Sequence, residues 1–146
     1  MTETFDGAKL AILCGSSVVT LLRDDIPGIV YPGHWDLPGG GREGGEAPLA
    51  CALRETEEEV GLRVPESAVV WGRAFDRPEG LRQWLFVAEM PDLAVSELRL
   101  GDEGQRWELM PLDRFLGMPN AVPHLKARLA VYLDEVGRAQ APRSSF

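Results

Sequence analysis

Residues 40–62 read GGREGGEAPLACALRETEEEVGL, a glycine-rich loop that runs into a glutamate-rich segment. Pro48 favours the first turn of a helix, because an N–H group at that position would have no partner within the helix. Gly61 favours the left-handed conformation that commonly ends a helix. The stretch therefore predicts a helix over residues 47–60, with Ala47 as a weak N-cap.

The predicted helix has a core face and a separate acidic face. At about 100° per residue, the core face collects Leu49, Ala52, Leu53, Thr56 and Val60. Glu55, Glu58 and Glu59 fall together on another side, where like charges repel by about 0.2–0.5 kcal/mol per pair. A divalent cation would turn this repulsion into a binding site, and carboxylate oxygens suit Mg²⁺ or Mn²⁺. The alternative is a solvated acidic surface.

The spacing of glycines and charged residues in this stretch resembles the signature of the Nudix hydrolases. The matching positions are Gly40, Glu46, Arg54-Glu55, Glu58-Glu59 and Gly61-Leu62. Thr56 is the departure, because the family usually has an apolar residue there, but Thr56 lies on the core face, where its methyl group can pack. Residues 35–40 also resemble the family's lead-in to the signature.

The resemblance implies which groups hold the metal. Glu55, Glu58 and Glu59 would be ligands, with Mg²⁺ as the cofactor and Mn²⁺ as a substitute. A backbone carbonyl of the Gly39-Gly40 turn would be a further ligand, and we assign it to Gly40, because glycine lets the backbone approach an ion closely. Glu55 would also act as the general base or as a metal-bridging group.

Four residues around these carboxylates have supporting roles in the prediction. Arg54 would orient the carboxylates by hydrogen bonds and, with Glu55 and Glu58, complete the catalytic set; a surface ion pair of little energy is its alternative. Glu46 would support the site without binding the ion. Arg42 and His34 are predicted to contact substrate, with solvated or packing roles as their alternatives.

A second patch resembles one subgroup of the family. Residues 102–107 and 119–120 are similar to the C-terminal third of MutT-type proteins, which hydrolyse oxidised guanine nucleoside triphosphates. Their glutamate in the first segment reaches the metals, which implies Glu103, and their asparagine before the last helix hydrogen-bonds the purine, which implies Asn120. The alternatives are a turn residue for Glu103 and a helix N-cap for Asn120.

The rest of the chain predicts an α+β fold. Short apolar runs bounded by turn residues predict strands at residues 9–14, 18–22, 35–37, 68–75, 83–88 and 106–110. Residues 38–46 are expected to be a loop, 111–116 a helical turn and 120–136 a second long helix, with an apolar stripe formed by Leu125, Leu129, Tyr132 and Val136. This order favours a mixed β-sheet between helices, and the resemblance implies the Nudix α/β/α sandwich.

Length and composition bound the remaining possibilities. The 146 residues fit one domain, with residues 138–146 expected to be a loose tail. The formal net charge of −8 argues against nucleic acid or a membrane surface as partner, and no apolar run reaches the ~18 residues of a membrane span. Cys14 and Cys51 lack metal or redox spacing and suit free thiols in a reducing compartment, so we expect a cytoplasmic protein. We expect it to be a monomer or a homodimer.

Together these features predict a Mg²⁺-dependent pyrophosphohydrolase. Its substrate would be a nucleoside diphosphate linked to another moiety, first of all a nucleoside triphosphate such as an oxidised purine nucleotide. Pro78 lies sixteen residues after Leu62, near a position where ADP-ribose pyrophosphatases of the family carry a proline, so ADP-ribose or a nucleotide sugar is the alternative substrate. A non-catalytic nucleotide-binding module is the alternative outside the enzyme class.

Overall fold

The computed structural model describes residues 4–78 and 81–140, and within this part it contains a seven-stranded sheet and three α-helices. The strands are β1 (Gly7–Cys14), β2 (Ser17–Leu22), β3 (Trp35–Asp36), β4 (Gly39–Gly41), β5 (Val69–Asp76), β6 (Arg82–Glu89) and β7 (Arg106–Pro111). The helices are α1 (Pro48–Val60), α2 (Leu112–Gly117) and α3 (Pro123–Gln140), and short 3₁₀ turns lie at Glu66–Ala68 and Val95–Glu97.

The sheet is mixed, as the sequence predicted. Its main path runs β3-β2-β1-β6-β5, with β4 paired to β1 and β7 paired to β2. β1 and β6 are parallel, with Gly7 opposite Gln83 and Leu13 opposite Glu89, and the other pairs are antiparallel. β1 is therefore central, and its first residues, Gly7 to Lys9, pair with β4 along one edge and with β6 along the other.

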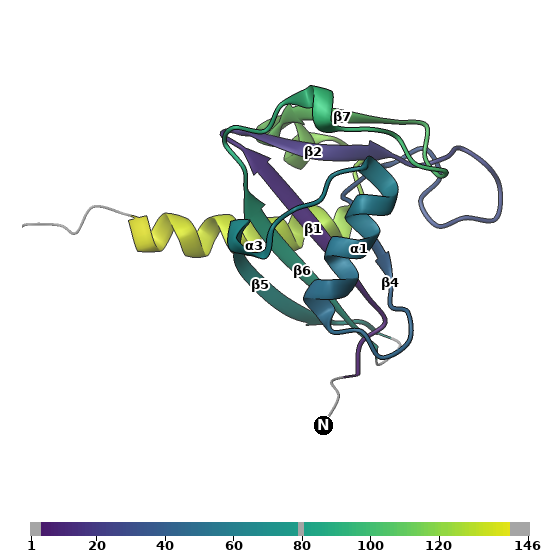
Figure 1. Cartoon of the computed structure of the whole chain (residues 1–146), viewed down its shortest axis with the longest axis horizontal. Coiled ribbons are helices and arrows are strands. Elements are labelled where there is room, and N and C mark those ends of the chain that lie inside the picture. Colours follow the sequence, from purple (N-terminus) through teal and green to yellow (C-terminus); the bar gives the residue numbers. More distant parts are fainter. Residues whose placement is uncertain (1–3, 79–80, 141–146) are drawn as a thin grey trace, which may run out of the picture.

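Helices cover both faces of the sheet (Figure 1). Alternate residues of β1 point to opposite sides, because the side-chain period of a strand is two. Leu10 and Ile12 pack in the core that includes Cys51, Ala52 and Val60 of α1. Ala11 and Leu13 pack in the second core, which holds Phe115 of α2 and the α3 residues Leu125, Leu129 and Tyr132. The α/β/α sandwich is thus confirmed, together with the apolar stripe of the last helix.

The predicted and observed elements differ in three places. Gly39–Gly41 forms strand β4 within the predicted loop, paired with Gly7, Ala8 and Lys9. The last helix begins at Pro123 instead of residue 120, because Trp35 holds the chain before it: the Trp35 N–H donates to the Asn120 carbonyl and the Val122 N–H donates to the Trp35 carbonyl. The expected tail at 138–146 is wrong for residues 138–140, which continue α3, and residues 141–146 lie outside the described part.

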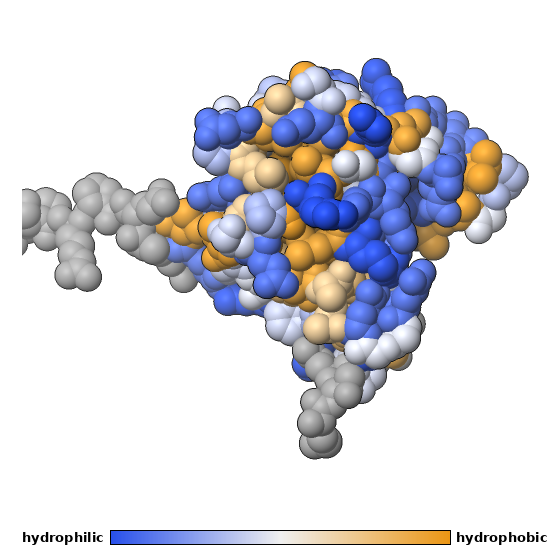
Figure 2. Space-filling view, in the orientation of Figure 1, coloured by the Kyte–Doolittle hydropathy of each residue, from blue (hydrophilic) through white to orange (hydrophobic). Residues whose placement is uncertain are grey.

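The surface over helix α1 is hydrophilic. Figure 2 shows hydrophilic residues over the part of α1 that faces the viewer, and Glu57 and Glu58 of that helix are exposed. None of the helices in residues 4–78 and 81–140 is long and apolar enough to cross a lipid bilayer.

Candidate active site

Helix α1 presents the predicted carboxylates as expected. Its C-cap, Gly61, has φ of 68°, and its N–H donates to the Glu57 carbonyl at 3.0 Å. Thr56, which departs from the family pattern, is buried, and its hydroxyl donates to the Ala52 carbonyl one turn earlier at 2.7 Å. A buried hydroxyl with a partner costs little, so Thr56 occupies an apolar position without disturbing the helix.

Arg54 connects the loop before α1 to the carboxylate face. Its Nε and Nη2 donate to the two oxygens of Glu46 at 3.0 and 2.8 Å, and Nη2 also donates to the Gly41 carbonyl at 2.9 Å. Nη1 donates to both Glu55 and Glu58, each at 3.0 Å. The hydrogen bond from Arg54 lowers the pKa of Glu46 to about 2. The arginine therefore makes the predicted contacts to the carboxylates, and Glu46 fixes the arginine.

The Gly39 peptide is held from both sides. Its N–H donates to Glu59 at 2.6 Å, and its carbonyl accepts from the Lys9 ammonium at 3.1 Å. Lys9 also donates to the Leu37 carbonyl at 3.3 Å and to the buried Asp36 carboxylate at 3.0 Å. Side chains from two elements, Glu59 of α1 and Lys9 of β1, thus fix the start of β4.

Two carboxylates of this site, those of Glu55 and Glu59, are partly removed from solvent. Burial is the largest cause that raises the pKa of Glu59, to about 7, and burial likewise raises the pKa of Glu55. Gly40 leaves room beside Glu55, because a Cβ atom at that position would lie 2.6 Å from Glu55 Oε2. Desolvated carboxylates next to a glycine backbone are the hard oxygen donors that Mg²⁺ and Mn²⁺ prefer, so the residues fit the predicted ion.

The residues supply the type of donor atom that the ion prefers, and in this structure their carboxylates form hydrogen bonds with other groups of the protein. Within the described residues, no three His, Cys, Asp or Glu side chains lie close enough together to hold an ion. Glu55 and Glu58 face Arg54, and Glu59 faces Gly39. An ion binding here would have to compete with these hydrogen bonds.

A cavity of about 570 Å³ lies beside the Gly40–Gly41 backbone. Its charged lining residues are Asp6, Lys9, Arg23, Asp36, Arg77 and Arg128, which gives a local excess of two positive charges in a chain of net charge −8. The volume is within the ~300–1,000 Å³ of small-molecule sites, and the charge suits an anionic ligand.

Two aromatic rings form part of the cavity lining. Tyr31 and His124 line it, with their ring centroids 5.9 Å apart. Tyr31 has φ of 51°, a left-handed conformation that is uncommon for a bulky residue and that is found mostly at functional sites. Burial lowers the pKa of His124, so its ring is neutral near pH 7. A planar, uncharged surface of this kind suits a nucleobase.

The structure separates the remaining predicted residues from this lining. His34 contacts the Tyr31 ring at 5.3 Å, and its Nδ1 lies 2.9 Å from the Pro32 carbonyl. Arg42 stacks on Phe5 at 4.4 Å and donates to the Glu46 carbonyl. Neither residue lines the cavity.

Glu103 and Asn120 also lie apart from the cavity lining. Both residues are exposed. Asn120 precedes α3 by three residues, so its alternative as the N-cap of that helix is wrong.

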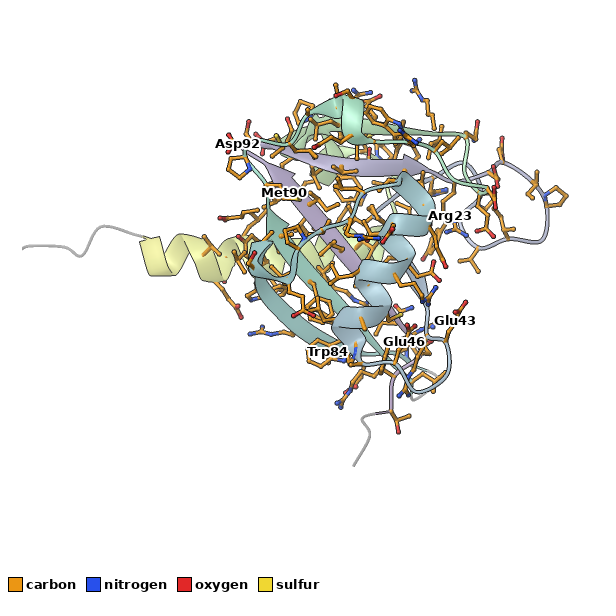
Figure 3. The ribbon with its side chains drawn as sticks, in the orientation of Figure 1. Arg23, Glu43, Glu46, Trp84, Met90 and Asp92 are labelled. Carbon is orange, nitrogen blue, oxygen red and sulfur yellow. The ribbon has the colours of Figure 1, made fainter. Side chains whose placement is uncertain are left out.

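Figure 3 shows Glu43 and Glu46 together in the loop before α1, with Arg23 further along the same side of the molecule.

Several residues that line the cavity had no signal in the sequence. Lys9 stood in an apolar strand, Tyr31 in a loop, and Arg77 in a turn. Arg23 and Lys9 both bind Asp36, at 2.9 and 3.0 Å, across three separate strands or loops. A local pattern cannot reveal such groups, because only the folded sheet brings them together.

Comparison with known proteins identifies the class that this site defines. The model of the NUDIX domain matches residues 7–131. An uncharacterised Nudix hydrolase of Pseudomonas aeruginosa is 31% identical over 134 residues, which cover 88% of this chain and 77% of that protein. The chain therefore belongs to the Nudix hydrolase superfamily, which confirms the resemblance read from residues 40–62.

Two further relatives show the range of the family. The asymmetrical bis(5'-nucleosyl)-tetraphosphatase of Sus scrofa is 37% identical over 87 residues, which cover 55% of this chain and 57% of the pig protein. This chain thus spans little more than half the length of that relative. The crystal structure of a MutT protein from Methanosarcina mazei superposes with a TM-score of 0.70 at 19% identity, covering 92% of this chain and 97% of that one. This likeness concerns the fold.

Divalent metal is expected to raise thermal stability, and to do so more at pH 8 than at pH 5.5. A ligand that binds only the folded state adds about 2.7 kcal/mol at a hundredfold excess over its Kd. Because the pKa of Glu59 is raised to about 7, the metal-free folded protein holds a proton that the unfolded chain releases above about pH 4.5. Metal-free stability should therefore fall as the pH rises from about 4.5 to 7, and metal should reverse the loss.

The measurement is a melting curve with Mg²⁺ or Mn²⁺ at both pH values, with NaCl at matched ionic strength as control. An equal melting temperature with and without divalent metal at pH 8 would contradict a metal site in the substrate-free protein.

Proposed function

We propose that this protein is a divalent-metal-dependent pyrophosphohydrolase that cleaves a nucleoside diphosphate linked to another moiety, with a nucleoside triphosphate as its first substrate. An oxidised purine nucleotide is one such substrate, and the products would be a nucleotide and pyrophosphate. The observation that carries this proposal is the position of Gly40. A Cβ atom at this glycine would lie 2.6 Å from the Glu55 carboxylate, and the same residue lines the cationic cavity.

The residues of the site would have three roles: metal binding, proton transfer and orientation of the carboxylates. Glu55, Glu58, Glu59 and the Gly40 carbonyl would hold Mg²⁺ or Mn²⁺, which supplies neutralisation of phosphate charge and a lower pKa for bound water. Glu55 suits the role of general base, because its raised pKa brings its proton affinity nearer to neutral pH. Arg54 would keep the Glu55 and Glu58 carboxylates oriented.

The alternatives differ in what supports them. Pro78 lines the cavity, which favours ADP-ribose or a nucleotide sugar as the second substrate class. The complete set of Arg54, Glu55, Glu58 and Glu59 weighs against a non-catalytic module, since a protein released from catalysis has no need to keep all four.

A substrate screen with product identification tests the proposal. Nucleoside triphosphates, 8-oxo-purine triphosphates, ADP-ribose and a nucleotide sugar would each be incubated with Mg²⁺ or Mn²⁺. Release of pyrophosphate together with a nucleoside monophosphate is the expected result. Hydrolysis of ADP-ribose alone would replace the first substrate by the second, and binding without hydrolysis of any of them would favour the module.

Asn120→Ala is expected to lower kcat/KM for purine nucleotides by about tenfold and to leave stability within about 0.5 kcal/mol. The side chain is exposed and lies outside α3, so its removal takes away no helix cap. Pyrimidine nucleotides serve as the internal control, and their kcat/KM should fall less. An unchanged purine-to-pyrimidine ratio would remove Asn120 from base recognition and leave that task to the Tyr31 and His124 rings.

A further inference from the structure

One part of the cavity takes no role in the site described above. Arg77, Gln83 and Arg128 line it, with Asp6 beside them. Gln83 pairs with Gly7 across β6 and β1, and Gly7 pairs with Gly41 across β1 and β4. His124 and Arg128 are one turn apart on α3, about 6 Å along the helix axis. Arg128 therefore lies one helical turn beyond His124, and β1 lies between the strands that carry Gln83 and Gly41.

Arg128 is a guanidinium with spare hydrogen-bonding capacity. It donates from Nη1 to Gln83 Oε1 at 3.0 Å and stacks on the Phe75 ring at 5.0 Å, and in the described part of the chain no carboxylate lies within ion-pair distance of it. Asp6 Oδ1 is the one buried side-chain nitrogen or oxygen there without a partner. The remaining donors of Arg128 and the amide NH₂ of Gln83 are therefore open to solvent or to a ligand.

The charges of Arg77, Arg128 and Asp6 favour an anion in this part of the cavity. Arg77 donates to Asp6 Oδ2 at 2.5 Å, so the carboxylate fixes this arginine and offsets one charge. Arg77 and Arg128 line the same cavity, where their like charges repel, and burial together with the charge of Arg77 lowers the pKa of Arg128. A bound anion would relieve this repulsion. Guanidinium groups bind phosphate oxygens through geometrically matched pairs of N–H donors.

We propose that Arg77, Gln83 and Arg128 form a subsite for the terminal phosphate of a nucleoside triphosphate. The assignment rests on the function proposed above, and it takes the Tyr31 and His124 rings as the surface on which the base stacks and the Gly40 backbone as the position of the cleaved diphosphate. The third phosphate then extends toward Arg128. The subsite selects substrates with three or more phosphates over nucleoside diphosphates and over ADP-ribose, which carry no phosphate there.

Arg128→Gln tests the subsite, with kcat/KM measured for a nucleoside triphosphate, the matching diphosphate and ADP-ribose. The triphosphate value should fall about 10–100-fold, since hydrogen bonds to a charged group are the strong ones, and the other two by less than threefold. Arg128→Lys should recover part of the loss. Arg114→Gln removes the same charge outside the cavity, from an exposed pair with Glu108, and should change none of the three values.

Equal losses for triphosphate and diphosphate, or no loss at all, would overturn the subsite. Binding of inorganic tripolyphosphate, measured by calorimetry in metal-free buffer, separates this outcome from failure of the proposed hydrolysis. If the wild-type protein hydrolyses no nucleotide but binds tripolyphosphate at least tenfold more tightly than Arg128→Gln does, the subsite stands and the hydrolytic function falls. Equal binding by both proteins overturns the subsite independently of any activity.

Discussion

Glu58→Gln is expected to lower the catalytic rate at least 100-fold and to leave the fold intact. The substitution keeps the size of the side chain and removes one negative charge from the predicted metal ligands, and loss of metal charge at a hydrolytic site is costly. The structural cost is small, because the Glu58 side chain is 56% exposed and accepts, among the described residues, one hydrogen bond, from Arg54 Nη1 at 3.0 Å. Surface pairs at this spacing contribute about 0.3–0.5 kcal/mol.

Glu57→Gln is the matched control. Glu57 is the preceding residue on the same helix, has a side-chain exposure of 48%, and pairs with Arg63 at 3.3 Å on a different side of α1. Its substitution removes the same charge and should change the rate less than twofold. Melting temperatures of both variants would confirm that each is folded. Near-normal turnover by folded Glu58→Gln would remove the proposed metal site.

Gly40→Ala should reduce activity by about 30–100-fold with a stability change below about 1 kcal/mol. The new Cβ would lie 2.6 Å from Glu55 Oε2 and 2.7 Å from its Cδ, so the carboxylate must move. Displacement by about 1 Å is enough to cost about 100-fold in a positioned active site. The fold should tolerate the change, because the displaced atoms are the flexible end of a side chain and replacing glycine also restricts the unfolded chain.

Gly41→Ala controls for the loss of a glycine in β4. A Cβ atom at Gly41 would meet only the Asp6 carbonyl at 3.9 Å, an ordinary contact. This variant should keep activity within about threefold of the wild type. Equal loss in the two variants would indicate that the strand, and not the position of Glu55, limits the reaction. A crystal structure of Gly40→Ala with an unmoved Glu55 carboxylate would likewise contradict the explanation.

The sequence predicted the elements that carry their own local signals. Helix α1 was predicted almost to the residue, because Pro48 and Gly61 mark its ends and its apolar period is clear. Strand β4 was missed because three consecutive glycines have no alternation of apolar and polar side chains. Its pairing with Gly7, Ala8 and Lys9 is a contact between distant parts of the chain. The start of α3 was misplaced because Asn120 resembles an N-cap, whereas Trp35 holds that segment extended.

The candidate site likewise contains contacts that local spacing predicts and contacts that only the folded chain creates. The contacts of Arg54 with Glu46, Glu55 and Glu58 follow from spacing on one helix and its preceding loop, and the structure contains them. The cavity depends on Arg77 and Arg128, which lie 51 residues apart and meet only after the sheet and α3 have assembled. A single sequence holds no pattern that links such positions.

The shared guanidinium of Arg54 has a consequence for how this domain tolerates change. Five acceptor oxygens, on Gly41, Glu46, Glu55 and Glu58, accept hydrogen bonds from this one side chain. Substitutions within one hydrogen-bonded network do not add, so these positions are epistatic: once Arg54 is gone, the Glu46 carboxylate loses both bonds to the guanidinium and keeps the one that it accepts from the Glu43 N–H. Engineering of the loop before α1 should therefore treat Glu46 and Arg54 as one unit, because the effect of changing one depends on the residue present at the other.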